Sequence, residues 1–426
     1  MKRTLKYCAV GFCVTVLLAA LLLYLCEFIP QGLVQRHLAQ SVPTLLEEGI
    51  WNPIGDRMAN SLPDTNTDLL ILTESVSTNH SDPDSFLTNP MYESQEGEEY
   101  TAVVERMAEG ETEGSVRYYV RYWMGFRIII RALLAVLDFY EIRRLCALAF
   151  FALAALCVYS LSNHLNAKVG LAFALSLILI KPHVVAVCFQ FACCFLIAMS
   201  AMLLVPRLKK SNLPWAFLFM ELGMLTMYFD FYTTPVITLA FPLTYLYLLR
   251  QRDGDTISLR TMLGYALAWG LGWLLMWLAK LALTSLLTDV DAFGDGFRQL
   301  QYWLTTSDTA DGEEKYSFFT AMAGIFQGFY QYPKWLAAFL AALAVFALVY
   351  MKKLRRGIVD GKTLRNSIGV LFAAGLGLLW LVVTSRPAYW HSWFQYRTMA
   401  AIFWPIAAWL AYAIVPTPAE SRRQLP

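Results

Sequence analysis

Three carboxylates lie close together in the stretch DTNTDLLILTES, which begins at Asp64. Asp64 and Asp68 are four residues apart, so their side chains share one face if the stretch is helical. A carboxylate flanked by apolar residues can act as a general base toward an acceptor hydroxyl. The structural alternative is that Asp64 caps the helix that follows, a common role for aspartate. Asp68 is therefore the first candidate catalytic residue, with Asp64 and then Glu74 behind it.

A second group alternates arginine with aromatic residues in the stretch VRYYVRYWMGFRIIIRALL. Arg117 and Arg121 carry forked guanidinium groups that match phosphate oxygens, while Tyr122 and Trp123 offer ring faces to a sugar or a headgroup. The stretch predicts helix in the plane of the membrane interface, with its arginines directed toward headgroups. A lipid headgroup and a substrate phosphate are equally good partners for this group.

The densest cluster is SRPAYWHSWFQYR, which connects two apolar runs near the end of the chain. It contains Trp390, His391, Tyr396 and Arg397. A histidine among aromatic residues can donate a hydrogen bond to a phosphate or a hydroxyl. The alternative is an aromatic girdle with one anchoring arginine.

Polar residues at other membrane edges complete the set of candidates. The stretch KPH contributes Lys181 and His183, and DFYTTP contributes Asp230 where a broken segment could line a cavity. Glu221 and Lys280 lie inside apolar runs, where charges are costly and are functional hypotheses by default, as partners of each other or with Glu221 as a proton carrier.

Composition assigns the chain to the integral membrane proteins. It has 426 residues, of which 58% are hydrophobic and 15% are charged. The eight cysteines lie in or beside apolar runs without metal-ligand spacing, so we interpret them as small buried side chains. The sequence contains no Gly-rich phosphate loop, HExxH motif or serine nucleophile elbow. No cofactor is predicted, a divalent cation is left open, and no nucleic-acid partner is indicated.

Hydropathy predicts an all-α polytopic fold of about ten transmembrane helices. The predicted spans are 8–29, 142–163, 167–181, 184–205, 213–229, 234–249, 261–286, 334–351, 367–384 and 398–415. They divide the chain into a first transmembrane helix (1–29), a long outer loop with interfacial helices (30–141), a nine-helix bundle (142–415) and a tail (416–426). The acidic part of the outer loop, 94–115, is predicted to be a mobile surface stretch.

Lys and Arg in the short loops place both termini on the cytoplasmic side of the plasma membrane. The carboxylates and the basic-aromatic clusters then face outward. Arg143 and Arg144 add two cations at the outer mouth of the second span, against the usual charge distribution, and this requires an anionic partner there.

One N-terminal span, a long acidic outer segment and many further spans together resemble the C-type (GT-C) membrane glycosyltransferases. The segments TDLLIL, RYWMGFRIIIRALL, FDFYTTPVITLAFPL and HSWFQYR are also similar to segments of uncharacterised bacterial multispan proteins. In those proteins we expect Arg-Tyr-Trp-His-Gly, whereas this chain has Met124 at the histidine position. Any role of that histidine is absent here or has moved to another residue.

The resemblance implies inverting transfer of a sugar from a polyprenyl-phosphate donor to a cell-envelope acceptor on the outer face. Asp68 would be the base. The phosphate would be held by Arg117, Arg121, His391 and Arg397, together with Lys181 and His183 at the outer edge. The sugar and prenyl approaches would be lined by Tyr122, Trp123, Asp230, Trp390 and Tyr396.

Two other classes of protein remain open. A transporter or flippase for an anionic or lipid-linked envelope precursor would use the same cations, would depend on Glu221 and would have little need of Asp68. A non-catalytic envelope-assembly protein would bind its partner through the acidic stretch 93–113.

Overall fold

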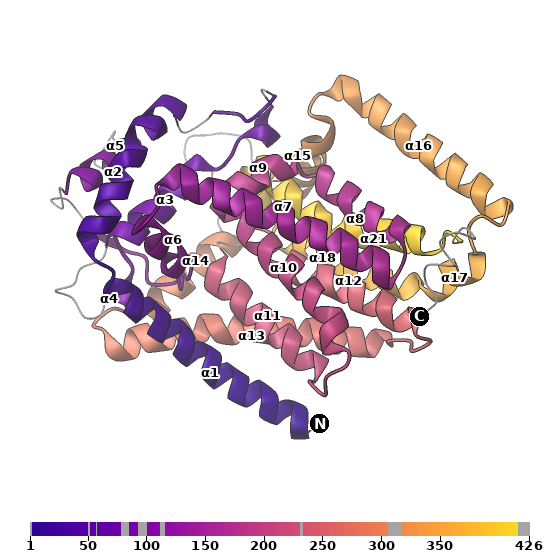
Figure 1. Cartoon of the computed structure of the whole chain (residues 1–426), viewed down its shortest axis with the longest axis horizontal. Helices are drawn as coiled ribbons and strands as arrows, with labels where there is room; N and C mark the ends of the chain where they lie inside the picture. Colours follow the sequence, from indigo (N-terminus) through magenta and orange to yellow (C-terminus); the bar gives the residue numbers. More distant parts are fainter. Residues whose placement is uncertain are drawn as a thin grey trace.

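The computed structural model describes residues 2–49, 52–56, 58–77, 85–92, 100–110, 116–230, 233–305 and 317–415 (Figure 1). Most of these residues are in helices. Two three-residue strands, β1 (Pro90–Tyr92) and β2 (Val116–Tyr118), pair antiparallel with Met91 opposite Arg117. Apart from this small sheet, the predicted all-α class is confirmed for the described residues. The predicted tail, 416–426, lies outside them.

Within the described residues, five helices are long and apolar enough to cross a membrane: α1 (Lys2–Glu27), α7 (Phe139–His164), α10 (Phe189–Leu208), α13 (Leu259–Leu287) and α16 (Pro333–Arg355). Shorter apolar helices accompany them: α8 (Ala167–Ile178), α11 (Trp215–Phe229) and η2 with α18 (Ile368–Val370 and Leu371–Val383). Two further helices, α12 (Ile237–Arg252) and α21 (Ala400–Tyr412), pack against α10 and α18. This set gives the chain the character of a membrane protein, as hydropathy predicted.

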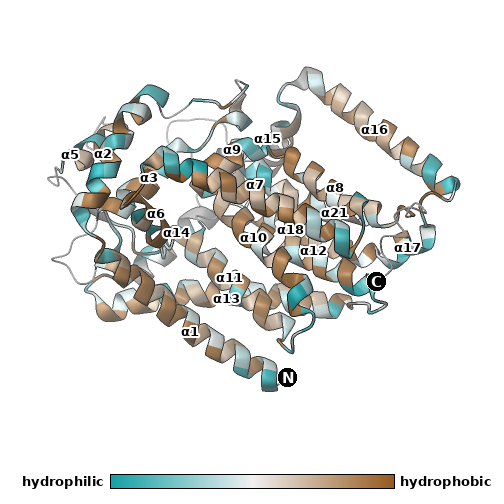
Figure 2. Cartoon of the chain, in the orientation of Figure 1, coloured by the Kyte–Doolittle hydropathy of each residue, from teal (hydrophilic) through white to brown (hydrophobic). Residues whose placement is uncertain are grey.

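The long helices α1, α7 and α16 slope in the same direction across the molecule, inclined to its long axis (Figure 1). Their hydrophobic flanks contrast with hydrophilic residues near the N-terminus, the loop after α10 and the end of α16 (Figure 2). The remaining short elements of this part are α9 (Pro182–Val187), α14 (Ala292–Thr305), α15 (Phe318–Tyr330), α17 (Gly361–Asn366), α19 (Ser385–Trp390), α20 (Ser392–Gln395) and η3 (Tyr396–Met399). Several helices begin where a side chain near the first turn accepts hydrogen bonds from the free backbone amides. For example, Asp138 and Glu141 form a capping box at the start of α7.

Glycines allow α11 and α13 to cross closely. A β-carbon at Gly223 would overlap the carbonyl oxygen of Trp269, and one at Gly272 would overlap that of Met220. The two backbones therefore touch at this crossing, which is a common solution where both helices are apolar and only close packing favours their association.

The segment between α1 and α7 forms a second packed body at one end of the molecule (Figure 1). Its elements are α2 (Gln31–Glu48), η1 (Ala59–Ser61), α3 (Thr65–Val76), α4 (Ser85–Thr88), α5 (Tyr100–Glu109) and α6 (Arg127–Leu134). The prediction of a mobile acidic stretch is wrong for α5. This helix buries Val103, Val104 and Met107 in a shared apolar cluster with Leu38 and Leu72.

The predicted interfacial helix with arginines directed toward headgroups is also wrong. Only the eight residues of α6 are helical, and Arg131 is fully buried. Its guanidinium donates to the backbone oxygens of Cys26 (3.1 Å), Ile29 (2.8 Å) and Ser75 (3.0 Å). Cys26 and Ser75 lie in the last turns of α1 and α3, where helices leave carbonyls without intrahelical partners. Arg131 therefore ties these helix ends together.

Arg127 has the same kind of role. It is fully buried, pairs with Glu27 at the end of α1 (2.5 Å) and donates to the side-chain oxygen of Asn89 (2.9 Å). Both arginines of α6 thus bind groups inside the protein and not lipid phosphates.

Candidate functional site

Asp64 acts as the N-cap of α3, as the structural interpretation of the sequence predicted. Its carboxylate accepts hydrogen bonds from the backbone amide of Thr67 (3.1 Å) and from the Thr67 hydroxyl (2.8 Å). The side chain is almost completely buried. Burial raises the pKa of Asp64, while the Thr67 bonds and the positive charge of Arg397 oppose that rise.

Asp68, one turn further along α3, is fully buried at the start of α10. Its Oδ1 accepts from the backbone amides of Phe189 (3.0 Å) and Gln190 (3.4 Å). These are first-turn amides of α10, which have no partners within their own helix. A carboxylate there is also favoured by the helix dipole. The contact joins the outer segment to the bundle.

Arg143 of α7 supplies the positive charge nearest to Asp68. Its Nη2 lies 3.6 Å from the Asp68 carboxylate, and its Nη1 donates to Glu48 at 2.9 Å. Arg143 is one of the two outer cations that lacked an anionic partner in the sequence. The structure gives it two carboxylates, so its position does not require an anion from outside the protein.

Burial controls the protonation of Asp68. Desolvation raises its pKa from 3.8 to about 7, with Asp64 adding to the rise and Arg143 and the Gln190 amide opposing it. A carboxyl group with a pKa near neutrality can accept and release a proton under physiological conditions, as a general base must.

Arg397 reaches the same region from the other end of the chain. It is fully buried, and its Nη2 donates to the backbone oxygen of Asn60 at 2.9 Å. Its guanidinium carbon lies 4.3 Å from the ring centroid of Phe191. The Nε and Nη1 groups of Arg397 have no hydrogen-bond partner within the described part of the chain. No described carboxylate forms an ion pair with Arg397.

We define the outer junction, named for the side on which the sequence predicts it to lie, as Asp64, Asp68, Arg143 and Arg397. Asp64 is the N-cap of α3, and the other three residues lie in α3, α7 and η3. The junction is closed on one side by α15, where Asn60 donates to the Gly328 carbonyl (2.5 Å) and the Tyr396 ring occupies the position that a β-carbon on Gly328 would take. The buried Tyr396 hydroxyl also lacks a described partner.

Two of the predicted phosphate ligands have carboxylate partners within the chain. Arg121 pairs with Asp295 of α14 at 3.1 Å and lies over the Tyr119 ring at 4.3 Å. Lys181 pairs with both oxygens of Asp56 at 2.9 Å. These ion pairs join segments that are distant in the chain, and the two cations are not part of the junction.

The other predicted site residues are separate from the junction or only partly described. The side chain of Arg117 lies outside the described residues. His183 is exposed beside Gly55, Trp390 is 48% exposed, and His391 stacks on Phe394 with a ring-centroid distance of 5.2 Å. Burial lowers the pKa of His391. The described contacts link neither histidine to Asp68.

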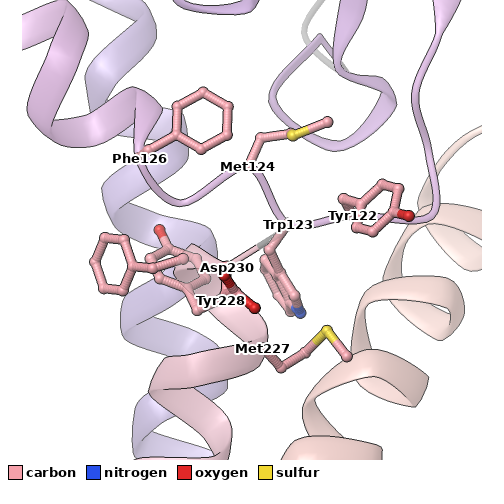
Figure 3. A pocket seen from close by; sticks show the side chains of 8 residues that line it. Tyr122, Trp123, Met124, Phe126, Met227, Tyr228 and Asp230 are labelled. Atoms are coloured by element: carbon pink, nitrogen blue, oxygen red, sulfur yellow. The ribbon is translucent and has the colours of Figure 1, made fainter. Parts of the chain in front are cut away.

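Three predicted substrate-lining residues do meet at one hollow (Figure 3). Tyr122, Trp123 and Asp230 line it, together with Met124. The hollow is too narrow to admit a water molecule. The Trp123 indole donates to the Met276 carbonyl at 2.7 Å, so this side chain also fixes the loop onto α13. A sugar could enter here only after these side chains moved.

The two charges inside apolar runs do not pair with each other. Glu221 accepts from the hydroxyl of Thr15 in α1 at 2.7 Å, while Lys280 donates to the backbone oxygen of Leu87. Glu74 is buried near Arg127 and Lys280, and neither of its oxygens has a partner in the described chain. Burial raises the pKa of Glu74 to about 8.

Sequence reasoning missed three partners of the junction residues. They are Asn60, the first-turn amides of α10 and the Cys188 thiol, which donates to Asp68 Oδ1 at 3.6 Å. None of them has a sequence signature. The described residues contain no cluster of three or more His, Cys, Asp or Glu side chains that could hold a metal ion. Comparison with protein-family models, with curated proteins and with solved structures finds no match.

Proposed function

We propose that the chain is a membrane glycosyltransferase of the GT-C type, with about ten transmembrane helices and its reactive centre on the outer face. It would move a sugar from a polyprenyl-phosphate donor to a cell-envelope acceptor. One observation carries this proposal. A buried arginine with two unpartnered N–H groups lies beside the segment that holds two buried carboxylates, one of them with a pKa near 7.

In the proposed reaction, Asp68 takes the proton of the acceptor hydroxyl as the hydroxyl oxygen attacks the anomeric carbon. The bond between this carbon and the phosphate oxygen breaks, and polyprenyl phosphate leaves with inversion. The free N–H groups of Arg397 stabilise the charge that develops on the leaving phosphate. Because Asp68 and Arg397 are both fully buried, the outer junction must open for the substrates to enter.

The test is release of polyprenyl phosphate by purified, reconstituted protein from a panel of polyprenyl-phosphate sugars. Asp68→Asn and Arg397→Ala should abolish release. Glu221→Gln should preserve it, and so should Arg121→Ala, a matched control whose guanidinium pairs with Asp295. Equal losses in Arg121→Ala and Arg397→Ala would argue against a specific phosphate role for Arg397.

A transporter for an anionic or lipid-linked precursor is the second candidate, and Glu221 is the observation that favours it. This residue lies in the middle of α11, and one of its carboxylate oxygens has no partner in the described chain. Wild-type protein that releases nothing from any donor, yet moves a labelled lipid between leaflets in a Glu221-dependent way, would establish transport in place of transfer.

A further inference from the structure

Helix α16 is separated from the bundle along its middle. Every residue from 341 to 349 is exposed, and this length covers all faces of a helix with 3.6 residues per turn. Only 6% of its apolar stretch is buried. In Figure 1 the helix stands apart from the rest of the molecule, whereas the other long helices lie together.

Both ends of α16 are nevertheless attached. At the far end, the Tyr350 hydroxyl donates to the Leu410 carbonyl of α21 at 3.0 Å, and Val415 donates to the Ile358 carbonyl at 3.0 Å. At the near end, α16 follows α15, which packs against η3 through Gly328. The helix is therefore attached to the bundle at both ends, while its middle is separated from the bundle.

The space beside α16 must be filled by hydrocarbon. Leu340, Leu343, Phe346 and Leu348 are each more than half exposed, so the helix presents large apolar side chains in every direction. In a bilayer, an empty gap beside the helix is unfavourable because the side chains that line it would lose dispersion contacts. Water is also an unfavourable occupant, because an apolar gap offers it no hydrogen-bond partners.

The inner end of this space is strongly basic. Six exposed cations follow one another from the last turn of α16 to α17: Lys352, Lys353, Arg355, Arg356, Lys362 and Arg365. Asp360 is the one acidic residue between 352 and 366, and its carboxylate is occupied in capping α17 through the amides of Lys362 and Thr363. No side chain of the six forms an ion pair with a described carboxylate.

We propose that an anionic phospholipid binds between α16 and the bundle. Its acyl chains would lie along α16, and its phosphate would contact the basic residues at 352–356. Charge decides against a second copy of the chain as the occupant. Copies inserted with the same orientation would bring the same basic ends together, and like charges repel.

The experiment uses the full chain in a mild detergent with equal amounts of phosphatidylglycerol and phosphatidylcholine. Native mass spectrometry counts the retained lipids. Wild type should retain phosphatidylglycerol preferentially. The triple variant Lys352→Gln, Lys353→Gln, Arg355→Gln should bind it more weakly, by about fivefold for each residue that touches the headgroup. All three side chains are exposed, so the variant should fold.

The matched control replaces Arg207, Lys210 and Arg260 by Gln, three exposed cations at the ends of other helices. It should bind phosphatidylglycerol like wild type. Three results would overturn the proposal: no preference in wild type, an equal loss in the control, or a stable dimer cross-linked through α16. Either of the first two results would mean that the basic residues of α16 and α17 attract lipid no more than other surface charges do. The third result would mean that a second copy of the chain occupies the space beside α16.

Discussion

At the scale of single residues, the junction contains two buried arginines with different surroundings. Arg143 is shared between the carboxylates of Asp68 and Glu48. Arg397 has one backbone acceptor and no described carboxylate partner, which is costly for a buried cation. Such a cost is tolerated where a ligand supplies the missing charge, so the two arginines should respond differently to substitution.

The raised pKa of Asp68 predicts a pH dependence of stability. Burial favours the protonated form in the folded state, with a pKa of about 7 against an ordinary value of 3.8. The stabilising contribution is complete below 3.8 and is lost as the pH rises through 7. The melting temperature of wild type should therefore fall over this range relative to Asp68→Asn, whose amide does not titrate. Parallel curves for the two proteins would show that Asp68 titrates normally.

The proposed general-base role predicts the opposite trend for activity. Release of polyprenyl phosphate should rise with pH through about 7, because only the deprotonated Asp68 accepts a proton. The measurement is kcat/KM from pH 5 to pH 9 in reconstituted protein. A flat profile over this range would remove Asp68 as the base while leaving its structural role at α10 intact.

Arg397→Lys tests whether geometry, beyond charge alone, matters at the junction. Lysine keeps the charge but loses the fork and the stacking on Phe191. Binding of a short-chain prenyl phosphate, measured by calorimetry, should weaken about 10- to 100-fold, the size of one or two charge-assisted hydrogen bonds. Arg121→Lys is the control. If both variants bind like wild type, the N–H groups of Arg397 do not contact phosphate.

At the scale of elements, close contacts between helices depend on glycines in particular positions. Gly223 and Gly272 bring α11 and α13 into backbone contact, and the hollow lined by Trp123 and Asp230 lies at the end of α11. Similarly, Gly125 donates to the Tyr228 carbonyl at 2.9 Å, and a β-carbon there would come within 2.6 Å of that oxygen. Gly125 thus lets the loop that carries Trp123 approach the end of α11 closely.

Gly272→Ala should destabilise the protein by about 1–3 kcal/mol, because the added methyl overpacks the crossing of α11 and α13. Gly270→Ala is a matched control two residues away in α13, where a β-carbon would have no neighbour within 4 Å. Alanine there should be neutral or slightly stabilising. Melting curves in detergent compare the two variants. Similar melting temperatures for both would indicate that the crossing can relax.

At the scale of the whole molecule, the two ends differ in character. The packed segment from α2 to α6 lies at one end, and α17 and the basic end of α16 lie at the other (Figure 1). The long apolar helices run between these two ends (Figure 1). The topology that we propose assigns the outer junction and the basic cluster of α16 to opposite sides of the membrane.

Cysteine labelling tests this arrangement in a variant without the eight native cysteines. A membrane-impermeant maleimide should label Trp390→Cys in intact cells, since the position is exposed at the proposed outer face. Lys210→Cys and Lys362→Cys should react only after permeabilisation, because both lie in loops predicted to be cytoplasmic. Labelling of all three in intact cells would contradict the proposed sidedness.

The sequence by itself determined the features that depend on local pattern. Long apolar runs predict membrane helices because each helix satisfies its own backbone hydrogen bonds. The N-cap role of Asp64 is readable because its partner, Thr67, is three residues away. The pair Asp64 and Asp68 falls on one side of α3 for the same local reason, the period of the helix.

Only the tertiary structure decided which of the charged residues meet. Asp68 bonds to an amide 121 residues away, and Arg397 to a carbonyl 337 residues away. The sequence predicted that Arg131 is directed toward lipid because its partners, backbone carbonyls at the ends of α1 and α3, belong to helices distant in the chain. Every residue except proline has the same backbone N–H and C=O groups, so the sequence does not show which of them a charged side chain will bind. A charged residue that binds the backbone therefore looks, in the sequence, the same as one that binds a ligand.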